Sequence, residues 1–366
     1  MPTRTKRGPM HRRIAEEIRQ EILSGTFTEG AQLPTEVELV KRFSASRPTI
    51  AQALRQLQYE GLIERRAGAG TFVRRETSKR GGLWGLIIPG LGNTEIFEPI
   101  CAEIALRARQ HGASLVWGGD ARQNKSPDAQ AVDLCQQCLR GKTDGVFFAP
   151  LELVEHKDEV NERIVASLKR AGIPVVLLDR DLCTFPQRSA FDLVSMDNLV
   201  AGYNLTDHVL SCGAKNPRFV LRLRSASSVY LRMAGFREAL LKHGIAPQKK
   251  HICVGDPEEP AFVRMLVKQA DAVVCVNDHT AALLMRGFDK QGVRVPRDIR
   301  MAGFDDTKYA TLLSVPLTTV HQPCRAIGRA AAHAMLDRIR TPTLPPRQIL
   351  LRGELIVRES CGGKKK

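Results

Sequence analysis

Two rhythms of hydrophobic and polar positions divide the chain. In the first, apolar residues recur every three or four positions, and the run HRRIAEEIRQEIL places Ile14, Ile18 and Ile22 on one face of a helix. From Leu83 the rhythm changes to short, continuous apolar runs such as LWGLIIPG, DGVFFAP and PVVLLDRD, separated by stretches of helical length. We therefore expect a small helical domain followed by a larger α/β region.

The first region predicts three helices and a hairpin. Thr35 followed by Glu38 forms a capping-box pattern ahead of a short helix over about 36–43. A third helix is predicted to begin near Arg47, because Ser46 is a favoured N-cap and Pro48 is tolerated in the first turn. The run LIERRAGAGTFVRR predicts two short strands around a glycine-rich tip. This order is typical of a winged helix-turn-helix domain.

The second region alternates strands and helices in two consecutive sets. The first set includes helices near 97–111, 128–140 and 159–171, and the second includes strands PRFVLRLR, KHICVG, DAVVCVND and IRMAGFDD with helices near 230–243 and 279–291. Continuous apolar strands alternating with helices predict parallel sheets covered on both faces, here in two lobes. The predicted domains are residues 10–75, a charged linker over 76–82, and residues 83–360.

Polar residues follow several of the predicted strands, at the edge where ligands bind in open α/β sheets. Asn93 follows the first strand, Asp179-Arg180 follow VVLL, Asn277-Asp278 follow VVCV, and Asp305 follows MAGF. Each one alone is more typical of a cap or a turn. Together they predict a site that can hydrogen-bond vicinal hydroxyl groups.

The charge and the cysteine content of the chain limit the partners and cofactors that it is expected to bind. The 366 residues carry a formal charge of +16, and residues 1–82 hold 16 Lys/Arg against 9 Asp/Glu, which favours a polyanionic partner for the first region. The nine cysteines lack framework spacing, and the CxxC formed by Cys135 and Cys138 has no companion pair, so we expect structural thiols, no metal and no cofactor. No signal-peptide pattern and no apolar run of membrane-spanning length occur, which predicts a cytoplasmic protein without membrane contact.

Two functional classes, an enzyme and a nucleoid or RNA-binding protein, are compatible with parts of this pattern. Parallel sheets with charged strand ends also occur in enzymes, but the chain has no P-loop, no G-x-G-x-x-G after a strand, no HExxH and no G-x-S-x-G. The alternative that stays open is a sugar-modifying α/β enzyme with an accessory nucleic-acid-binding head. A nucleoid or RNA-binding protein would leave the two-lobed region of about 280 residues unexplained.

The stretch from Ile14 to Val73 closely resembles the winged helix of gluconate-repressor-type (GntR) bacterial regulators. The resemblance rests on the spacing G..LPTE.EL...F..SR.T...AL..L..EGLI.R..G.GTFV, which the chain matches almost throughout. Val37 and Ala51 stand where the family often has arginines, and Pro48 replaces a common threonine. These departures affect which operator sequence the domain would recognise.

The region from about 83 to 358 resembles the effector domain of lactose-repressor-type (LacI) regulators, which is related to periplasmic sugar-binding proteins. The resemblance rests on five segments: PVVLLDRD, VSMDNLVAGYNLTDHVL, LRMAGFREAL, VCVNDHTAALLMRGFDKQGVRVPRDIRMAGFDD and PLTTVHQPCRAIGRAAAHAML. The fusion resembles the arabinose-repressor type of sugar-responsive regulator. Tyr230 stands where some sugar repressors have an arginine, which leaves Arg232 as the arginine expected at the ligand.

These resemblances imply a repressor of carbohydrate-utilisation genes that binds double-stranded operator DNA as a homodimer and responds to a small sugar. The residues expected at DNA are Thr35, Glu36, Ser46, Arg47, Pro48, Thr49, Gln52, Arg65, Arg66, Gly68, Gly70 and Thr71. The residues expected at the effector are Asn93, Phe97, Asp179, Arg180, Asp197, Tyr230, Arg232, Asn277, Asp278 and Asp305.

Overall fold

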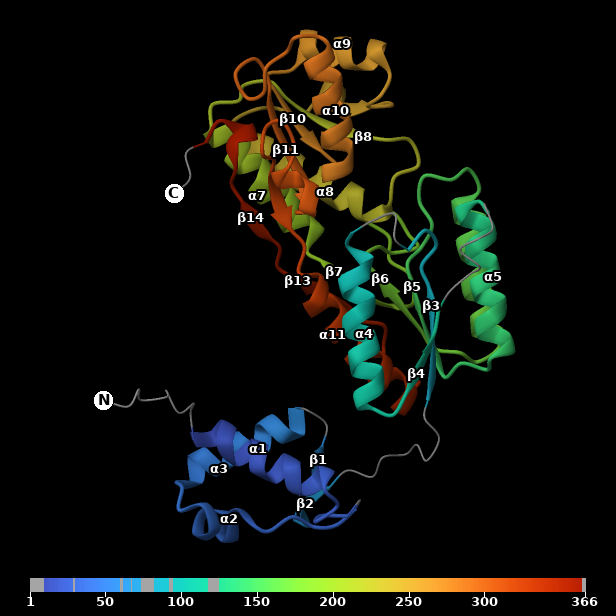
Figure 1. Ribbon diagram of the computed structural model, residues 1–366, viewed down its shortest axis with the longest axis vertical. Coiled ribbons are helices and arrows are strands. Elements are labelled where there is room, and N and C mark those ends of the chain that lie inside the picture. Colours follow the sequence, from blue (N-terminus) through green and yellow to red (C-terminus); the bar gives the residue numbers. More distant parts are fainter. Residues whose placement is uncertain are drawn as a thin grey trace. The chain divides into compact units, whose positions relative to one another are not determined.

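The computed structural model describes residues 10–28, 30–59, 62–66, 68–73, 82–91, 95–117 and 125–363. The chain divides into two compact units, residues 1–80 and 81–366 (Figure 1). Residues 76–81 of the predicted linker lie outside the described residues. Asn93 also lies outside them.

The first unit has the predicted three helices and hairpin. Its elements are α1 (Met10–Leu23), α2 (Glu36–Phe43), α3 (Arg47–Tyr59), β1 (Ile63–Arg66) and β2 (Gly70–Val73). Ile14 and Ile18 are buried against Ile50 and Leu54 of α3, as the helical spacing requires. The capping box is confirmed, because the Thr35 amide donates to the Glu38 carboxylate at 2.7 Å and the Glu38 amide to the Thr35 hydroxyl at 3.3 Å.

The second unit contains two six-stranded sheets, one in each lobe. The first sheet has the order β4-β3-β5-β6-β7-β13 and is parallel throughout; the second has the order β9-β8-β10-β11-β12-β14, in which only β14 runs antiparallel. The first sheet comprises β3 (Leu83–Ile87), β4 (Ser114–Val116), β5 (Gly145–Phe148), β6 (Val175–Leu178), β7 (Asp192–Met196) and β13 (Gln348–Leu351). The second comprises β8 (Pro217–Leu221), β9 (Ile252–Val254), β10 (Ala272–Cys275), β11 (Arg300–Asp305), β12 (Thr318–His321) and β14 (Glu354–Ile356).

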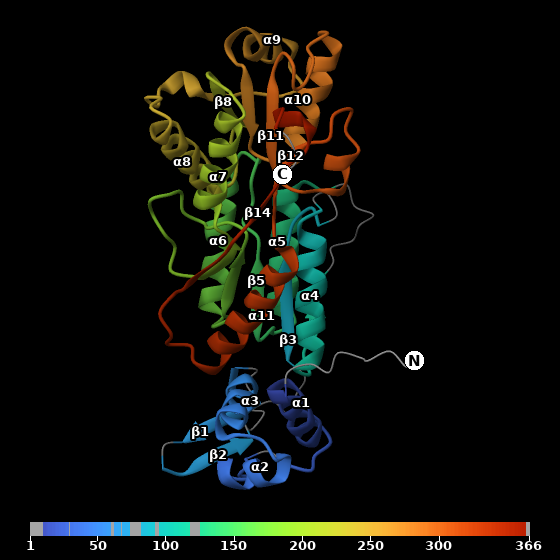
Figure 2. The same cartoon turned by 90° about the vertical axis from the view of Figure 1, so that its left-hand side faces the viewer.

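Helices cover both faces of each sheet, as continuous apolar strands predict (Figures 1 and 2). Alternate residues of β5 point to opposite layers: Phe147 packs beneath α4 and α11, whereas Val146 and Phe148 pack beneath α5 and α6. The second sheet lies between α7 and α8 on one face and α9 and α10 on the other. These helices are α4 (Phe97–Gln110), α5 (Pro127–Arg140), α6 (Lys157–Arg170), α7 (Asn198–Ser211), α8 (Ser227–Lys242), α9 (Pro260–Gln269), α10 (Asp278–Lys290) and α11 (Cys324–Arg340).

The chain passes between the lobes three times. It leaves the first sheet between β7 and α7, returns between β12 and α11, and leaves again between β13 and β14. The sequence pattern predicted two consecutive sets, and the structure instead completes both sheets with strands from the C-terminal part of the chain. Pairing between strands so far apart leaves no trace in local periodicity.

Two glycines let α7 and α8 touch backbone to backbone. A Cβ atom at Gly202 would overlap the carbonyl of Arg232, and one at Gly235 would overlap the carbonyl of Leu199. Only glycine permits such an approach. The contact fixes the backbone of Arg232 against the start of α7, next to the first crossing between the lobes.

The CxxC pair lies on α5, as predicted, and both thiols are buried and free. The sulfur of Cys138 packs where Gly85 of β3 lacks a side chain. Burial raises the pKa of Cys138 to about 12, so its thiol is protonated and unreactive at neutral pH. None of the helices that the structure describes combines the length and apolar character needed to cross a bilayer.

Candidate DNA-binding surface and effector site

The first turn of α3 is exposed and sharply defined. The Ser46 hydroxyl lies 2.8 Å from the Thr49 hydroxyl and accepts from the Thr49 amide at 3.4 Å, so the helix begins at Arg47 as predicted. Arg47, Pro48 and Gln52 are exposed, and Thr49 is half-buried. Within the described part of the first unit, Arg47 forms no ion pair, which leaves its guanidinium available to a ligand.

The arginines of the wing, β1 and β2, already have partners. Arg65 pairs with Glu36 at the start of α2, and this links the wing to the helix-turn-helix. Arg66 pairs with Glu64 at 2.6 Å and lies over the Phe72 ring at 4.8 Å. An incoming phosphate must compete with these carboxylates for both guanidinium groups.

The tip of the wing depends on its glycines. Gly68 and Gly70 have φ angles of 74° and 115°, which side chains rarely adopt. Gly70 also lies against the Gln32 side chain, whose amide donates to the carbonyl of Ala69 at 3.0 Å. The carbonyl of Thr71 accepts from the Leu33 amide at 2.8 Å, so the hairpin is anchored to the loop before α2.

In the second unit, one charged pair comes from the first lobe. Arg180, directly after β6, pairs with Glu152 and lies over the Phe97 ring at 5.5 Å. Its side chain is only 10% exposed, and its Nε–H has no hydrogen-bond partner among the described residues. The carboxylate of the neighbouring Asp179 accepts a hydrogen bond of 2.9 Å from the side-chain amide of Gln322, which lies at the second crossing between the lobes.

A second charged pair comes from the other lobe. Arg232 on α8 is buried, donating from Nε to Asn198 at 2.7 Å and from Nη1 to the carbonyl of Val276 at 2.5 Å. Its Nη2 lies 3.5 Å from the carboxylate of Asp305, and its guanidinium lies 4.5 Å from the centre of the Phe304 ring. The side chain is therefore held in one orientation by groups on several elements.

The carboxyl groups from the two lobes influence one another. Burial raises the pKa of Asp305 to about 6; the Arg232 guanidinium opposes this rise, and the carboxylates of Asp179 and Glu152 add to it. The charged groups of the first lobe are thus close enough to Asp305 to disfavour its ionisation. A ligand with hydroxyl donors between the lobes would relieve this repulsion.

The backbone is strained at the same place. Asp179, Asp305 and Asp306 have φ angles of 67°, 105° and 54°, in the region that side chains rarely adopt. Leu153 and Arg224, also at positive φ, join the lobes through a bond of 2.9 Å from the Leu153 amide to the Arg224 carbonyl. Strained backbone of this kind collects at ligand sites.

Further hydrogen bonds join the two lobes around these pairs. The Ala226 amide donates to Glu152 at 3.2 Å, the Ser227 hydroxyl to the carbonyl of Asp181 at 2.7 Å, and the Lys308 amide to Glu95 at 2.6 Å. The sequence reasoning overlooked Glu152, Gln322 and Asn198. Glu152 could have been found, because it follows the apolar strand run GVFFAP.

Asp278 and Asn277 are positioned differently from the expected ligand contacts. Asp278 is fully buried, and its carboxylate accepts from the Thr319 hydroxyl at 2.7 Å and the Thr307 amide at 3.0 Å. Burial raises its pKa to about 7, and the charge of Asp305 adds to the rise. The Asn277 side chain accepts from the Thr280 amide at 2.8 Å and caps α10. In this structure both residues support their own lobe.

Three other residues expected at the effector are a helix cap, a core residue and a half-buried residue. The Asp197 side chain accepts from the Val200 amide at 3.1 Å and caps α7. Phe97 is 3% exposed and belongs to the core of the first lobe, with its ring against Arg180. Tyr230 is half-buried on α8.

A cavity of about 230 Å³ lies where the lobes meet. It is bordered by residues that follow β6, by β7 and β13, and by the first turns of α7 and α8; among its lining residues are Asp179, Arg180, Arg188, Asp197 and Ser228. Three expected effector residues thus share this cavity, whereas Arg232, Asp278 and Asp305 are packed outside its lining.

Comparisons with known proteins match both units. Residues 10–73 match the family described as bacterial regulatory proteins, gntR family, and residues 206–361 match the periplasmic binding protein-like domain. The arabinose metabolism transcriptional repressor of Geobacillus stearothermophilus is 29% identical over 367 residues, covering 96% of this chain and 97% of the relative.

The chain is a DNA-binding transcriptional regulator with a GntR-type winged helix-turn-helix and a periplasmic-binding-protein-like domain.

Solved structures support the fold of this regulator. The transcriptional regulator CelR in complex with cellobiose aligns with a TM-score of 0.64 at 23% identity, over 86% of this chain and 91% of that chain. A LacI family regulator from Enterococcus faecium with bound ribose aligns with a TM-score of 0.61 at 22% identity, over 76% and 98% of the two chains. The relative and the two solved structures named above are each described as a transcriptional regulator or repressor.

The buried Asp278 predicts how the stability of the second unit depends on pH. Its folded pKa of about 7 lies above the value of about 4 in an unfolded chain, so the proton it retains stabilises the fold below pH 4, and this stability is lost as pH rises to 7. Between pH 5 and 7.5 the free energy of unfolding of wild type should fall by about 2–3 kcal/mol relative to Asp278→Asn, which does not ionise. Urea unfolding followed by the fluorescence of Trp84 and Trp117, the only tryptophans, measures this.

Asp298→Asn is the matched control. Its carboxylate is exposed, and hydrogen bonds from Arg294 lower its pKa to about 2, so it is ionised in both states throughout this range. It should show no pH-dependent difference from wild type between pH 5 and 7.5. Equal pH dependence in wild type and Asp278→Asn would contradict the assignment.

Proposed function

We propose that this regulator represses carbohydrate-utilisation genes, and that a small sugar bound between the two lobes releases it from operator DNA. The observation that carries the proposal is the pair of arginine–carboxylate groups, Arg180–Glu152 and Arg232–Asp305, which extend from opposite lobes and interact electrostatically. Planar guanidinium groups and carboxylates are suited to bind the alternating donors and acceptors of vicinal hydroxyls.

The DNA-binding half of the proposal rests on the first turn of α3. A recognition helix reads base edges with its N-terminal residues, where Arg bridges guanine and Gln pairs with adenine. Arg47 and Gln52 are exposed on that turn. In this proposal Arg65, Arg66 and the backbone at Gly68 and Gly70 contact phosphates. The phosphates would first displace Glu36 and Glu64 from the two arginines.

The relatives support a carbohydrate as the effector class. The relative that covers nearly the whole chain is named for arabinose metabolism, and two similar structures contain cellobiose and ribose. The chemistry between the lobes agrees with this class, because its charged groups are partly buried and hydrogen-bonded, and an aromatic ring lies beside Arg180. The cavity beside Asp179 is large enough for a small polar molecule.

The response follows from the three crossings between the lobes. A ligand that contacts both lobes favours the state in which they are closed, by the difference in its affinity for the two states. Typical coupling free energies of about 1–3 kcal/mol change DNA affinity roughly 5–150-fold. The hydrogen bonds from Leu153, Ala226 and Ser227 across the lobes are the contacts that opening would break.

We also propose that the regulator is a homodimer assembled through its second unit. One winged helix reads a single half-site, so a two-fold operator needs two copies. Sedimentation of the full chain at micromolar concentration should show a dimer with or without operator DNA. A monomer under both conditions would contradict this.

Arg47→Ala should weaken binding to the operator by about 1–3 kcal/mol, because a bidentate contact to a base is lost. Its effect on random DNA should be much smaller. Arg65→Ala serves as the contrast: it should weaken binding to all sequences alike and reduce the slope of affinity against salt by about 1. Titration of labelled duplexes at several salt concentrations measures both. Equal losses on operator and random DNA for Arg47→Ala would overturn base recognition.

Arg180→Gln should abolish the response to sugar while operator binding without sugar stays unchanged. Glutamine retains a donor for Glu152 but lacks the charge and the second donor edge. A thermal-shift screen of pentoses and hexoses first identifies a sugar that binds, and operator affinity is then measured with and without it. Arg163→Gln, at an exposed position on α6, is the matched control and should respond as wild type does. A full response in Arg180→Gln would exclude Arg180 from the site, and tighter operator binding with sugar would reverse the proposed sign.

A further inference from the structure

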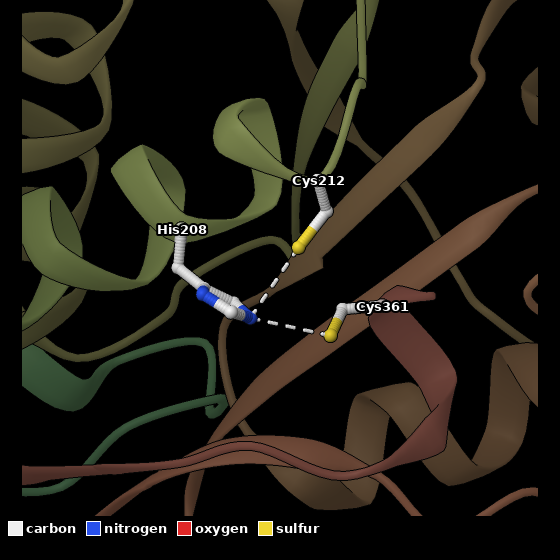
Figure 3. Close-up of side chains that lie close together, drawn as sticks. All are labelled: His208, Cys212 and Cys361. Carbon is white, nitrogen blue, oxygen red and sulfur yellow. Dashed lines mark hydrogen bonds between the residues drawn. The ribbon is translucent and has the colours of Figure 1, made fainter. Parts of the chain in front are cut away.

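Three metal-ligating side chains meet in the second lobe, and none of them is among the residues expected at DNA or at the effector. His208 lies in the last turn of α7, Cys212 caps the C-terminal end of that helix, and Cys361 comes from the short helix η3 (Glu359–Cys361) (Figure 3). Their ligand atoms all lie within 4.8 Å of one another. The sequence analysis expected no metal, because the CxxC pair has no companion pair. The 153 residues between His208 and Cys361 leave this cluster without a local signal.

The spacing of these atoms matches that around a tetrahedral metal ion. His208 Nε2 lies 3.3 Å from the sulfur of Cys361 and 3.5 Å from that of Cys212 (Figure 3). Zinc bonds of about 2.3 Å to sulfur and 2.0–2.1 Å to nitrogen, at a tetrahedral angle, place the two ligand atoms roughly 3.6 Å apart. Both distances from the imidazole nitrogen are therefore within a few tenths of an ångström of the tetrahedral value, and the two sulfurs lie within 4.8 Å of each other.

The position of Cys361 is fixed by its neighbours. The Ser360 hydroxyl donates to the carbonyl of Met301 at 2.7 Å and accepts from the Thr318 amide at 2.8 Å, which attaches η3 to the second sheet. The sulfur of Cys361 itself accepts from the Thr318 hydroxyl at 3.1 Å and from the Gly363 amide at 3.4 Å. The protonated thiol of Cys361 also donates to the carbonyl of Arg358 at 3.6 Å, a contact that a bound ion would replace. Hydrogen-bond donors around the sulfur are the surroundings that a ligating thiolate needs.

Access and charge are also suited to a cation. Cys361 is buried, whereas His208 and Cys212 are half-buried, so an ion can enter from their side. Two thiolates would neutralise a divalent ion beside the guanidinium of Arg300.

We propose that His208, Cys212 and Cys361 form a zinc site with two thiolates and one imidazole. Each thiol that is protonated releases its proton to solvent when its sulfur bonds the ion. Within the part of the chain that the structure describes, no fourth side chain joins the group, so a water or an exogenous ligand takes the fourth position. The ion would tie the C-terminal segment to α7, the helix that follows the first crossing between the lobes.

The test uses the full chain, reduced and stripped of metal with a chelator. Titration with zinc against a chromophoric indicator should show about one tightly bound ion per chain. Cobalt in place of zinc should give the near-ultraviolet charge-transfer band of thiolate ligation. Cys361→Ser and His208→Gln should both lose the tight site and the band, and the zinc-dependent rise in melting temperature should disappear with them.

Cys183→Ser is the matched control, because Cys183 is a half-buried free thiol of the other lobe. It should bind zinc and cobalt as wild type does. His208→Gln keeps the test decisive if Cys361→Ser fails to fold. Tight zinc binding that survives both substitutions would overturn the proposal. The proposal would also be overturned if the reduced wild-type chain bound no zinc tightly. This holds even if Cys212 and Cys361 form a disulfide in the oxidised chain.

Discussion

The architecture of the second unit depends on one topological constraint, the passage of the chain three times between its lobes. The first sheet is incomplete without β13, and the second is incomplete without β14, so neither lobe is finished until the last strands are made. Three short connections allow the lobes to move as bodies while remaining joined. They also bring the carboxyl ends of strands from both sheets to face one another.

The space between the lobes holds charges that burial makes costly. Arg180, Arg232, Asp179 and Asp305 are largely removed from water, and they are retained through specific partners such as Glu152, Gln322 and Asn198. Several backbone positions there have positive φ. A fold selected for stability alone would replace such groups with apolar side chains, since a buried ion pair contributes little net stability. Their presence agrees with a site in which binding is favoured at the expense of stability.

The first unit shows why net charge is a poor guide to individual contacts. Its excess of basic residues predicts a polyanionic partner, yet the two arginines of the wing are matched by Glu36 and Glu64. Arg47 is different, because its helix begins at Ser46 and projects it into solvent. The base reading proposed for Arg47 and the phosphate binding proposed for Arg65 and Arg66 therefore start from different states of the free protein: the first side chain is unpaired among the described residues, and the other two are paired.

The sequence by itself determined the elements of the first unit, the parallel α/β character of the second, and the two families that the chain resembles. The local signals were strong: the Thr35–Glu38 capping box, the glycines of the wing and the apolar strands all act within a few residues. Asp179, Arg180 and Asp305 were predictable at strand ends for the same reason. Asp278 carried the same local signal, yet the structure buries it beneath Thr319 and Gly303.

Only the tertiary structure decided which lobe each C-terminal strand completes, which polar residues face the opposite lobe, and which thiols meet a histidine. β13 pairs with β7 across about 150 residues, and Cys361 reaches His208 over a similar separation. Such contacts are set by the packing of whole sheets and helices, and periodicity within a window of ten or twenty residues carries no information about them.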